Sequence, residues 1–183
     1  LRKIKKKKFT FIIKLSEPKK DNIHFNLKRF KKNFNKYRQD LGKKHNFIIQ
    51  LVNRYKCNNP DIHLPYEQKT FDKIESTIIK LKKKNIIKSF YFFPYFKNTK
   101  KIKKYKFIEG ITIYRNLNEQ LNDDYAKLNN FKIIAMRTFG GNKKIIDNKN
   151  LKKLIMFNLN CKLVKKVIVG INNKVQLDQL LKA

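Results

Sequence analysis

Residues 167–183 read VIVGINNKVQLDQLLKA and combine a short β-branched run, a glycine, a polar loop and an amphipathic segment. The run of Val167, Ile168 and Val169 favours a buried strand, and Gly170 interrupts it. The apolar residues from Val175 onward recur at a spacing of three to four, which is typical of a helix. The stretch therefore predicts a strand that is followed closely by a helix.

The same alternation of strand and helix patterns extends upstream through the whole sequence. Apolar β-branched and aromatic runs predict strands at residues 9–15, 46–52, 87–93, 107–114, 132–138 and 166–169. Helical spacing of apolar residues predicts helices at residues 23–41, 71–81, 117–128, 151–159 and 175–182. Thr70 is the expected N-cap of the second helix and Gly42 the expected C-cap of the first.

Alternating strands and helices indicate an α/β fold with parallel strands. The strand runs are almost continuously apolar, as expected for strands that are buried on both faces. Such units form either an open doubly wound sheet or part of a (β/α)8 barrel, and periodicity alone leaves both open. With 183 residues, no internal repeat and no low-complexity linker, residues 1–183 are expected to form one domain.

The composition is strongly basic, with 46 Lys and Arg against 13 Asp and Glu and a net charge of +33. This charge makes a basic RNA-binding or ribosomal-type protein the alternative function, although the lysines are spread through the chain. Cys57 and Cys161 stand alone, which argues against a zinc site and fits a reducing cytoplasm. No apolar run approaches the roughly 20 residues of a membrane span.

Residues 167–183 resemble the closing strand and helix of the aldo/keto reductase family, in which an IVG strand end precedes a polar loop and a helix opening with QL. Three upstream segments resemble further elements of that family in the same order. They are residues 74–90 (IESTIIKLKKKNIIKSF), 108–116 (IEGITIYRN) and 132–141 (KIIAMRTFGG). The resemblance runs from about the third barrel strand to the end of the chain. It implies an incomplete TIM-type barrel of about the last six βα units.

The resemblance also implies a chemistry: reduction of a carbonyl substrate by NADPH, with a Tyr as general acid tuned by a Lys and an Asp, and a His that orients the substrate. The Tyr and Asp of the family correspond to positions before Leu1. Lys14 matches the catalytic Lys at the end of the third strand. Asn53 stands near the position of the His and supplies hydrogen bonds but no imidazole. Phe93 and Pro94 stand where the family has a Ser-Asn pair.

The residues that the resemblance assigns to NADP fall into two groups. Thr112 aligns with the Gln that holds the nicotinamide carboxamide, and Arg137 lies near the position of the aromatic residue that stacks on the ring. The phosphate group is matched by Gly170, Asn172, Asn173, Lys174 and Gln176, at the start of the last helix. The nicotinamide end is thus poorly kept, and the expected oxidoreductase is a diverged one with weak or lost activity.

Several other residues have a simpler interpretation. His24, His45 and His63 are not spaced as metal ligands and are expected to be solvated. Asp123 and Asp124 are expected on a solvated helix face. Gly140-Gly141 is read as a plain loop and residues 91–96 as packing of a barrel strand.

The hypotheses differ in what they predict. The reductase hypothesis predicts parallel strands with Lys14, Asn53, Thr112 and Gly170 at one sheet end. The RNA-binding alternative predicts antiparallel strands with an exposed basic face. A third hypothesis is a non-catalytic barrel that serves as a scaffold for a partner.

Overall fold

The computed structural model describes residues 8–17, 26–53, 60–94, 105–120, 123–140, 148–171 and 173–182. Within these ranges, side chains are not described for residues 16–17, 53, 60–67 and 148–149. The chain groups into two compact units, Leu1–Glu109 and Gly110–Ala183. Each unit is described by itself below.

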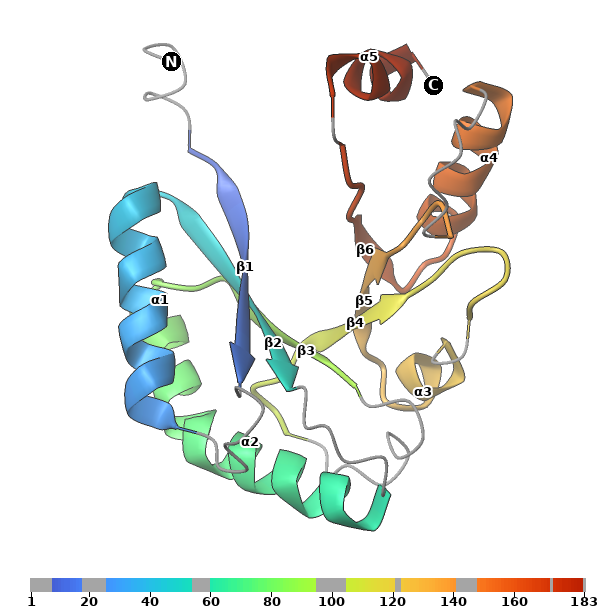
Figure 1. Cartoon of the computed structure of the whole chain (residues 1–183). Helices are drawn as coiled ribbons and strands as arrows, with labels where there is room; N and C mark the ends of the chain where they lie inside the picture. Colours follow the sequence, from blue (N-terminus) through green and yellow to red (C-terminus); the bar gives the residue numbers. More distant parts are fainter. Residues whose placement is uncertain are drawn as a thin grey trace. The chain divides into compact units, whose positions relative to one another are not determined.

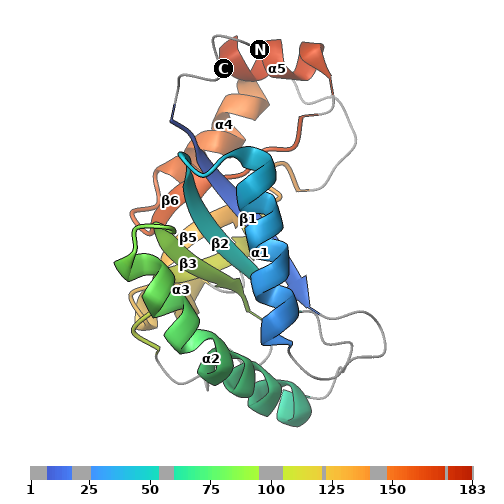
Figure 2. The same ribbon diagram turned by 90° about the vertical axis from the view of Figure 1, so that its left-hand side faces the viewer.

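The first unit is a parallel sheet of three strands with two helices on one face (Figure 1). Its strands are β1 (Thr10–Glu17), β2 (Asn46–Asn53) and β3 (Ser89–Phe93). Helix α1 (Leu27–Leu41) connects β1 to β2, and α2 (Pro60–Lys83) connects β2 to β3. Turned by 90°, the view in Figure 2 shows α1 lying over β1 and β2.

Aromatic side chains fill the layer between this sheet and its helices. Phe34 of α1 meets Phe47 of β2 edge-on at 6.1 Å between ring centroids, and Phe71 of α2 meets Phe92 of β3 at 5.1 Å. All four rings are at most 2% exposed, so each contributes most of its transfer free energy to folding. The apolar runs of the sequence thus form one face of the sheet and the core beneath it.

The second unit repeats this plan. Its strands are β4 (Gly110–Tyr114), β5 (Lys132–Met136) and β6 (Val164–Val167), which pair in parallel in chain order. Helix α3 (Asp123–Leu128) lies between β4 and β5, α4 (Asn148–Leu159) between β5 and β6, and α5 (Lys174–Lys182) after β6. Ile111, Ile113, Ile133 and Ala135 are fully buried and form the centre of this unit.

The predicted fold class is confirmed. Each strand pairs in parallel with its sequence neighbour inside its unit, as successive βα units of a (β/α) barrel do. The parallel pairing contradicts the antiparallel strands expected of a ribosomal-type fold. The connection from β3 to β4 includes residues 95–104, which lie outside the described residues.

Helix boundaries differ from the prediction at α2. Thr70 is not an N-cap, because the helix already begins at Pro60 and Thr70 is buried inside it. Proline fits the first helical turn, where its missing N–H leaves no hydrogen bond unmade. Pro60 and Pro65 favour a loop between residues 52 and 71, so the sequence pattern placed the start of the helix too late.

The ends of α1 follow the predicted chemistry more closely. The Oδ1 atom of Asn26 accepts a hydrogen bond of 2.9 Å from the Arg29 N–H, which fixes the start of the helix four residues after the predicted stripe began. Ile23, the first residue of that stripe, lies outside the described residues. Gly42, at φ 97°, is the C-cap and donates its N–H to the Arg38 carbonyl at 3.2 Å, as predicted.

Candidate functional site

The face of the first sheet opposite α1 and α2 carries a polar row across its strands. Side chains alternate along a strand, so the residues in register with Lys14 lie on the same face. Lys14 pairs with Gln50 of β2, and Gln50 pairs with Tyr91 of β3. Gln50 and Tyr91 are each 3% exposed, whereas Lys14 is exposed. The row therefore places one carboxamide and one phenol on the helix-free face, with the exposed Lys14 beside them on the edge strand, where it also lines a pocket against α1.

Lys14 does not end its strand. The strand β1 continues to Glu17, three residues beyond Lys14, and it is Glu17 that pairs with Asn53. Lys14 and Asn53 are thus offset by three strand positions, or about 10 Å along the strand. The sequence prediction shortened β1 because Ser16 and Glu17 interrupt the apolar run. The side chain of Asn53 lies outside the described residues.

Tyr91 holds its proton tightly. Burial is the main cause that raises the pKa of its phenol above the ordinary value, and the negative charge of Glu109 adds to it. Glu109 is itself anchored: its Oε2 atom accepts a hydrogen bond of 2.8 Å from the Phe90 N–H, and its Oε1 atom pairs with the Lys82 ammonium. Tyr91 is therefore a neutral hydrogen-bonding group at neutral pH.

At the C-terminal ends of β4 and β5, polar side chains form a connected cluster. The amide nitrogen of Asn116 donates to Glu119 Oε2 at 2.7 Å and to the Arg137 carbonyl at 3.2 Å. The Arg137 guanidinium lies 4.1 Å from the centre of the Tyr114 ring and 3.7 Å from Glu119 Oε1. The C-terminal ends of parallel strands are where α/β barrels carry their active sites. This cluster is therefore a candidate site.

Arg137 holds an unusual backbone conformation in this cluster. Its φ is 54°, in the left-handed region that is uncommon for residues other than glycine, and it directly follows β5. Its side chain is half exposed and is already engaged by Tyr114 and Glu119. A strained residue at a strand end is a feature that recurs at functional sites.

Two buried hydroxyls of the second unit have no hydrogen-bond partner among the described residues. They are Thr112 Oγ1 in the middle of β4 and Thr138 Oγ1, two residues after the end of β5. Thr112 is fully buried and Thr138 is 1% exposed. An unpaired buried hydroxyl costs free energy unless a ligand or water completes it, so both have hydrogen-bonding capacity to spare.

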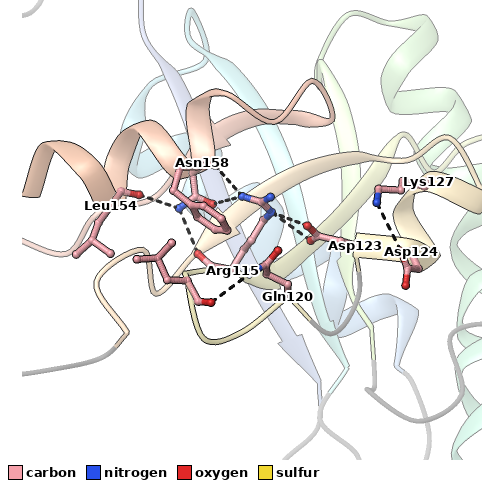
Figure 3. A network of polar contacts seen from close by, with 9 residues as sticks. Arg115, Gln120, Asp123, Asp124, Lys127, Leu154 and Asn158 are labelled. Atoms are coloured by element: carbon pink, nitrogen blue, oxygen red, sulfur yellow. Dashed lines mark hydrogen bonds and ion pairs between the residues drawn. The ribbon is translucent and has the colours of Figure 1, made fainter. Parts of the chain in front are cut away.

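A buried polar network that the sequence pattern did not predict lies just after the end of β4. Arg115 donates from Nε to both carboxylate oxygens of Asp123 and from Nη1 to Asn158 Oδ1 at 3.1 Å (Figure 3). The amide nitrogen of Asn158 in turn donates to the Arg115 carbonyl at 3.2 Å. The expectation of two solvated carboxylates is wrong for Asp123, which opens α3 and is 9% exposed, and holds for Asp124.

The connection from β6 to α5 contains most of the predicted phosphate residues. Gly170 is exposed, and α5 starts four residues later at Lys174. The side chain of Asn173 caps the helix: its Oδ1 atom accepts from the Gln176 N–H at 2.9 Å. The first turn of α5 has no acidic residue, and Lys174 and Gln176 are exposed. Asn172 lies outside the described residues.

The structure therefore brings some predicted residues together and leaves others in separate units. Asn173, Lys174 and Gln176 share one helix start, and Arg137 joins a cluster whose other members, Asn116 and Glu119, sequence reasoning missed. Lys14 and Asn53 belong to the first unit, and Thr112 and Gly170 to the second. In the sequence, Asn116 is marked as a candidate only by its position just after the apolar run of a predicted strand.

The remaining candidates carry no site. His45 is half buried rather than solvated, because its Nδ1 atom accepts a hydrogen bond of 3.1 Å from the Phe9 N–H and its ring packs on Phe11. His24 lies outside the described residues, as does the side chain of His63. Among the described ranges, no group of three His, Cys, Asp or Glu residues is arranged to hold a metal ion. In the same ranges, no helix has the length and apolarity needed to cross a bilayer.

Comparison with known proteins gives likenesses to solved structures only. No protein-family model matches the sequence, and no curated protein sequence matches it. One solved structure with a similar fold is the crystal structure of a thermostable aldo-keto reductase, Tm1743, in complex with the inhibitor epalrestat. The two chains are 10% identical, the match covers 84% of this chain and 71% of the other, and the TM-score is 0.40. A likeness at this level carries no argument about activity.

Proposed function

We propose that the chain is an aldo/keto reductase-like oxidoreductase that binds NADP(H) and reduces a carbonyl substrate weakly or not at all. The proposal starts from the sequence resemblance. The observation that carries it is the start of α5, which follows a parallel strand closely and has an asparagine cap, an exposed lysine and no acidic residue in its first turn.

The start of α5 fits a phosphate group. The first amides of a helix lack intrahelical partners, and the helix dipole adds partial positive charge there. Asn173 uses the Gln176 N–H, while the ammonium of Lys174 adds a full charge beside the remaining amides. These groups would hold the adenosine phosphate of NADP(H), with Gly170 in the adjacent loop.

The opposite end of the cofactor fits less well. Thr112 has a spare buried hydroxyl that would bond the carboxamide, and Arg137 would lie over the ring. When bound, the cofactor supplies the hydride for carbonyl reduction. The chain's own residues supply little proton transfer, because Asn53 does not titrate and Tyr91 has a raised pKa. Lys14 is the remaining candidate for positioning a substrate or a proton donor.

The test is cofactor binding rather than turnover. Binding of NADPH and of NADH is measured by calorimetry for the native chain, for Lys174→Ala and for the matched variant Lys182→Ala at the other end of α5. Loss of one phosphate contact is expected to weaken NADPH binding about tenfold, or 1.4 kcal/mol. NADH lacks the extra phosphate, so its binding should not change.

The proposal fails if neither nucleotide binds, or if both lysine variants weaken NADPH equally. Carbonyl reduction is then measured separately, as the loss of nicotinamide absorbance with a small aldehyde. Turnover that persists at the level of typical reductases would contradict the weak activity proposed here while leaving the cofactor assignment intact.

A further inference from the structure

Helix α1 presents an exposed face on which lysines predominate. Lys28, Lys32 and Lys36 follow one another at a spacing of four residues, so they form a row with steps of about 6 Å along the helix axis. Lys31, Asn35 and Gln39 lie beside this row, and all six side chains are exposed. The one carboxylate of α1, Asp40, follows Lys36 by four residues and so continues this row at the end of the helix, where it lines the pocket described next.

A pocket of about 370 Å³ adjoins the same face in the first unit. It opens between β1 and α1, and Lys36 belongs both to its lining and to the basic row. Its lining residues are Lys14, Leu15, Asn33, Lys36, Tyr37 and Asp40. The volume falls within the roughly 300–1,000 Å³ of small-ligand sites. Tyr37 is 45% exposed and lines the pocket, so an aromatic ring is open to solvent there.

We propose that the basic row of α1 and the adjoining pocket bind single-stranded nucleic acid. The lysines would follow successive phosphates, while one base enters the pocket and stacks on Tyr37, with Asn33 available for hydrogen bonds to the base edge. Positive grooves interleaved with aromatic side chains are how proteins hold single strands without sequence preference. This inference is independent of the proposed reductase function.

A membrane surface would suit the charge but not the rest of α1. Interfacial helices insert an apolar face into the headgroup region. The apolar face of α1 is already used, since Phe30 is 1% and Phe34 is 2% exposed against the sheet. The polar lining of the pocket is an amide, a phenol, two amines and the carboxylate of Asp40. This mixture of donors and acceptors suits the edge of a nucleobase better than it suits a lipid.

The experiment uses the full chain and a fluorescent oligouridylate, with anisotropy measured over a range of salt concentrations. The first variant is Lys28→Gln/Lys32→Gln/Lys36→Gln. Its control, Lys152→Gln/Lys153→Gln/Lys162→Gln, removes the same charge from three exposed lysines of the second unit. Each lost phosphate contact reduces the steepness of the plot of log affinity against log salt by about 0.7. The α1 variant loses three lysines, so its slope should be shallower by about 2 than that of the native chain.

A second pair of variants tests the pocket. Tyr37→Ala is expected to weaken binding at least about fivefold, because it removes a base-stacking surface, whereas Tyr37→Phe keeps the ring and the affinity. Circular dichroism checks that each variant keeps its helices, which exposed positions on α1 should allow.

Three outcomes overturn the proposal. One is an equal loss of slope in the α1 variant and in its control, which would show that net charge alone binds the oligonucleotide. Another is a native affinity that does not depend on salt. In the third, binding to vesicles containing phosphatidylserine depends on the α1 lysines and binding to the oligonucleotide does not. That result would assign the face to a membrane surface.

Discussion

Arg115 and Asp123 form an ion pair inside the second unit, in which the Nε–H of the arginine is shared between the two carboxylate oxygens, 3.1 and 2.9 Å away. The arginine side chain is 6% exposed and the aspartate side chain 13%. The pair joins the end of β4 to the start of α3, and Asn158 extends it to α4. One arginine thus ties together three elements that are separated in sequence.

Removing Asp123 should destabilise the second unit strongly. In Asp123→Ala the Arg115 charge stays buried without its counter-charge, which typically costs about 3–5 kcal/mol. The free energy of unfolding is measured by urea denaturation. Asp124→Ala is the matched control, because Asp124 is 86% exposed and forms a surface ion pair with Lys127 at 3.6 Å. Equal losses in the two variants would contradict the structural role given to the buried pair.

Glu109 should matter through its hydrogen bond to the backbone. Glu109→Ala leaves the buried Phe90 N–H without an acceptor, which costs about 1–3 kcal/mol. Glu109→Gln keeps an acceptor oxygen and should recover most of that loss, although it loses the charge paired with Lys82. Urea denaturation measures the free energy of unfolding of the two variants. If the glutamine variant were as unstable as the alanine variant, the ion pair with Lys82 would contribute more to stability than the hydrogen bond to Phe90.

The pKa of Tyr91 predicts a loss of stability at high pH. Burial, reinforced by the charge of Glu109, raises the pKa in the folded chain above the unfolded value of about 10. The unfolded state then loses its proton first, so the contribution is complete below pH about 10 and is lost as pH rises toward the folded pKa. Tyr91→Phe should therefore show a shallower decline in the free energy of unfolding at alkaline pH.

Denaturation series at several alkaline pH values measure this decline. Tyr105, whose pKa is raised by burial and by its hydrogen bond to Asp72, contributes in the same sense. The single variant should therefore flatten the profile only in part, and Tyr91→Phe/Tyr105→Phe should flatten it further. Superimposable profiles for all three proteins would rule out a buried phenol at both positions.

The strands could be predicted because burial on both faces leaves its mark on local sequence. The run at residues 46–52 is apolar apart from Asn46 and Gln50, and β2 occupies Asn46–Asn53. The last strand was placed two residues late, because Lys165 and Lys166 interrupt the pattern of β6. Lys165 is exposed, because its long side chain reaches solvent from within the strand. A strand position of this kind does not show in the apolar pattern.

The candidate site was harder to predict, because it depends on which strand positions share a face and an end. Lys14 was placed at a strand end, whereas register pairs it with Gln50 and Tyr91, well inside the sheet. Asp123 and Asp124 look identical in sequence, yet only Asp123 meets an arginine that lies eight positions earlier in the chain. Pairings of this kind arise from tertiary geometry and leave no periodic signal.

The cap of α5 allows its structural role to be separated from phosphate binding. Asn173→Asp keeps an equally good N-cap for the Gln176 N–H, and its charge favours the positive end of the helix dipole. The free energy of unfolding should therefore stay the same or rise. The same charge repels a phosphate at that helix start, so NADPH affinity should fall about tenfold or more while NADH affinity changes less. Calorimetry with both nucleotides measures this, and Asn173→Ser, which keeps the cap without the charge, is the control. If Asn173→Asp bound NADPH as tightly as the native chain, the phosphate would have to lie elsewhere, however well the helix start fits it.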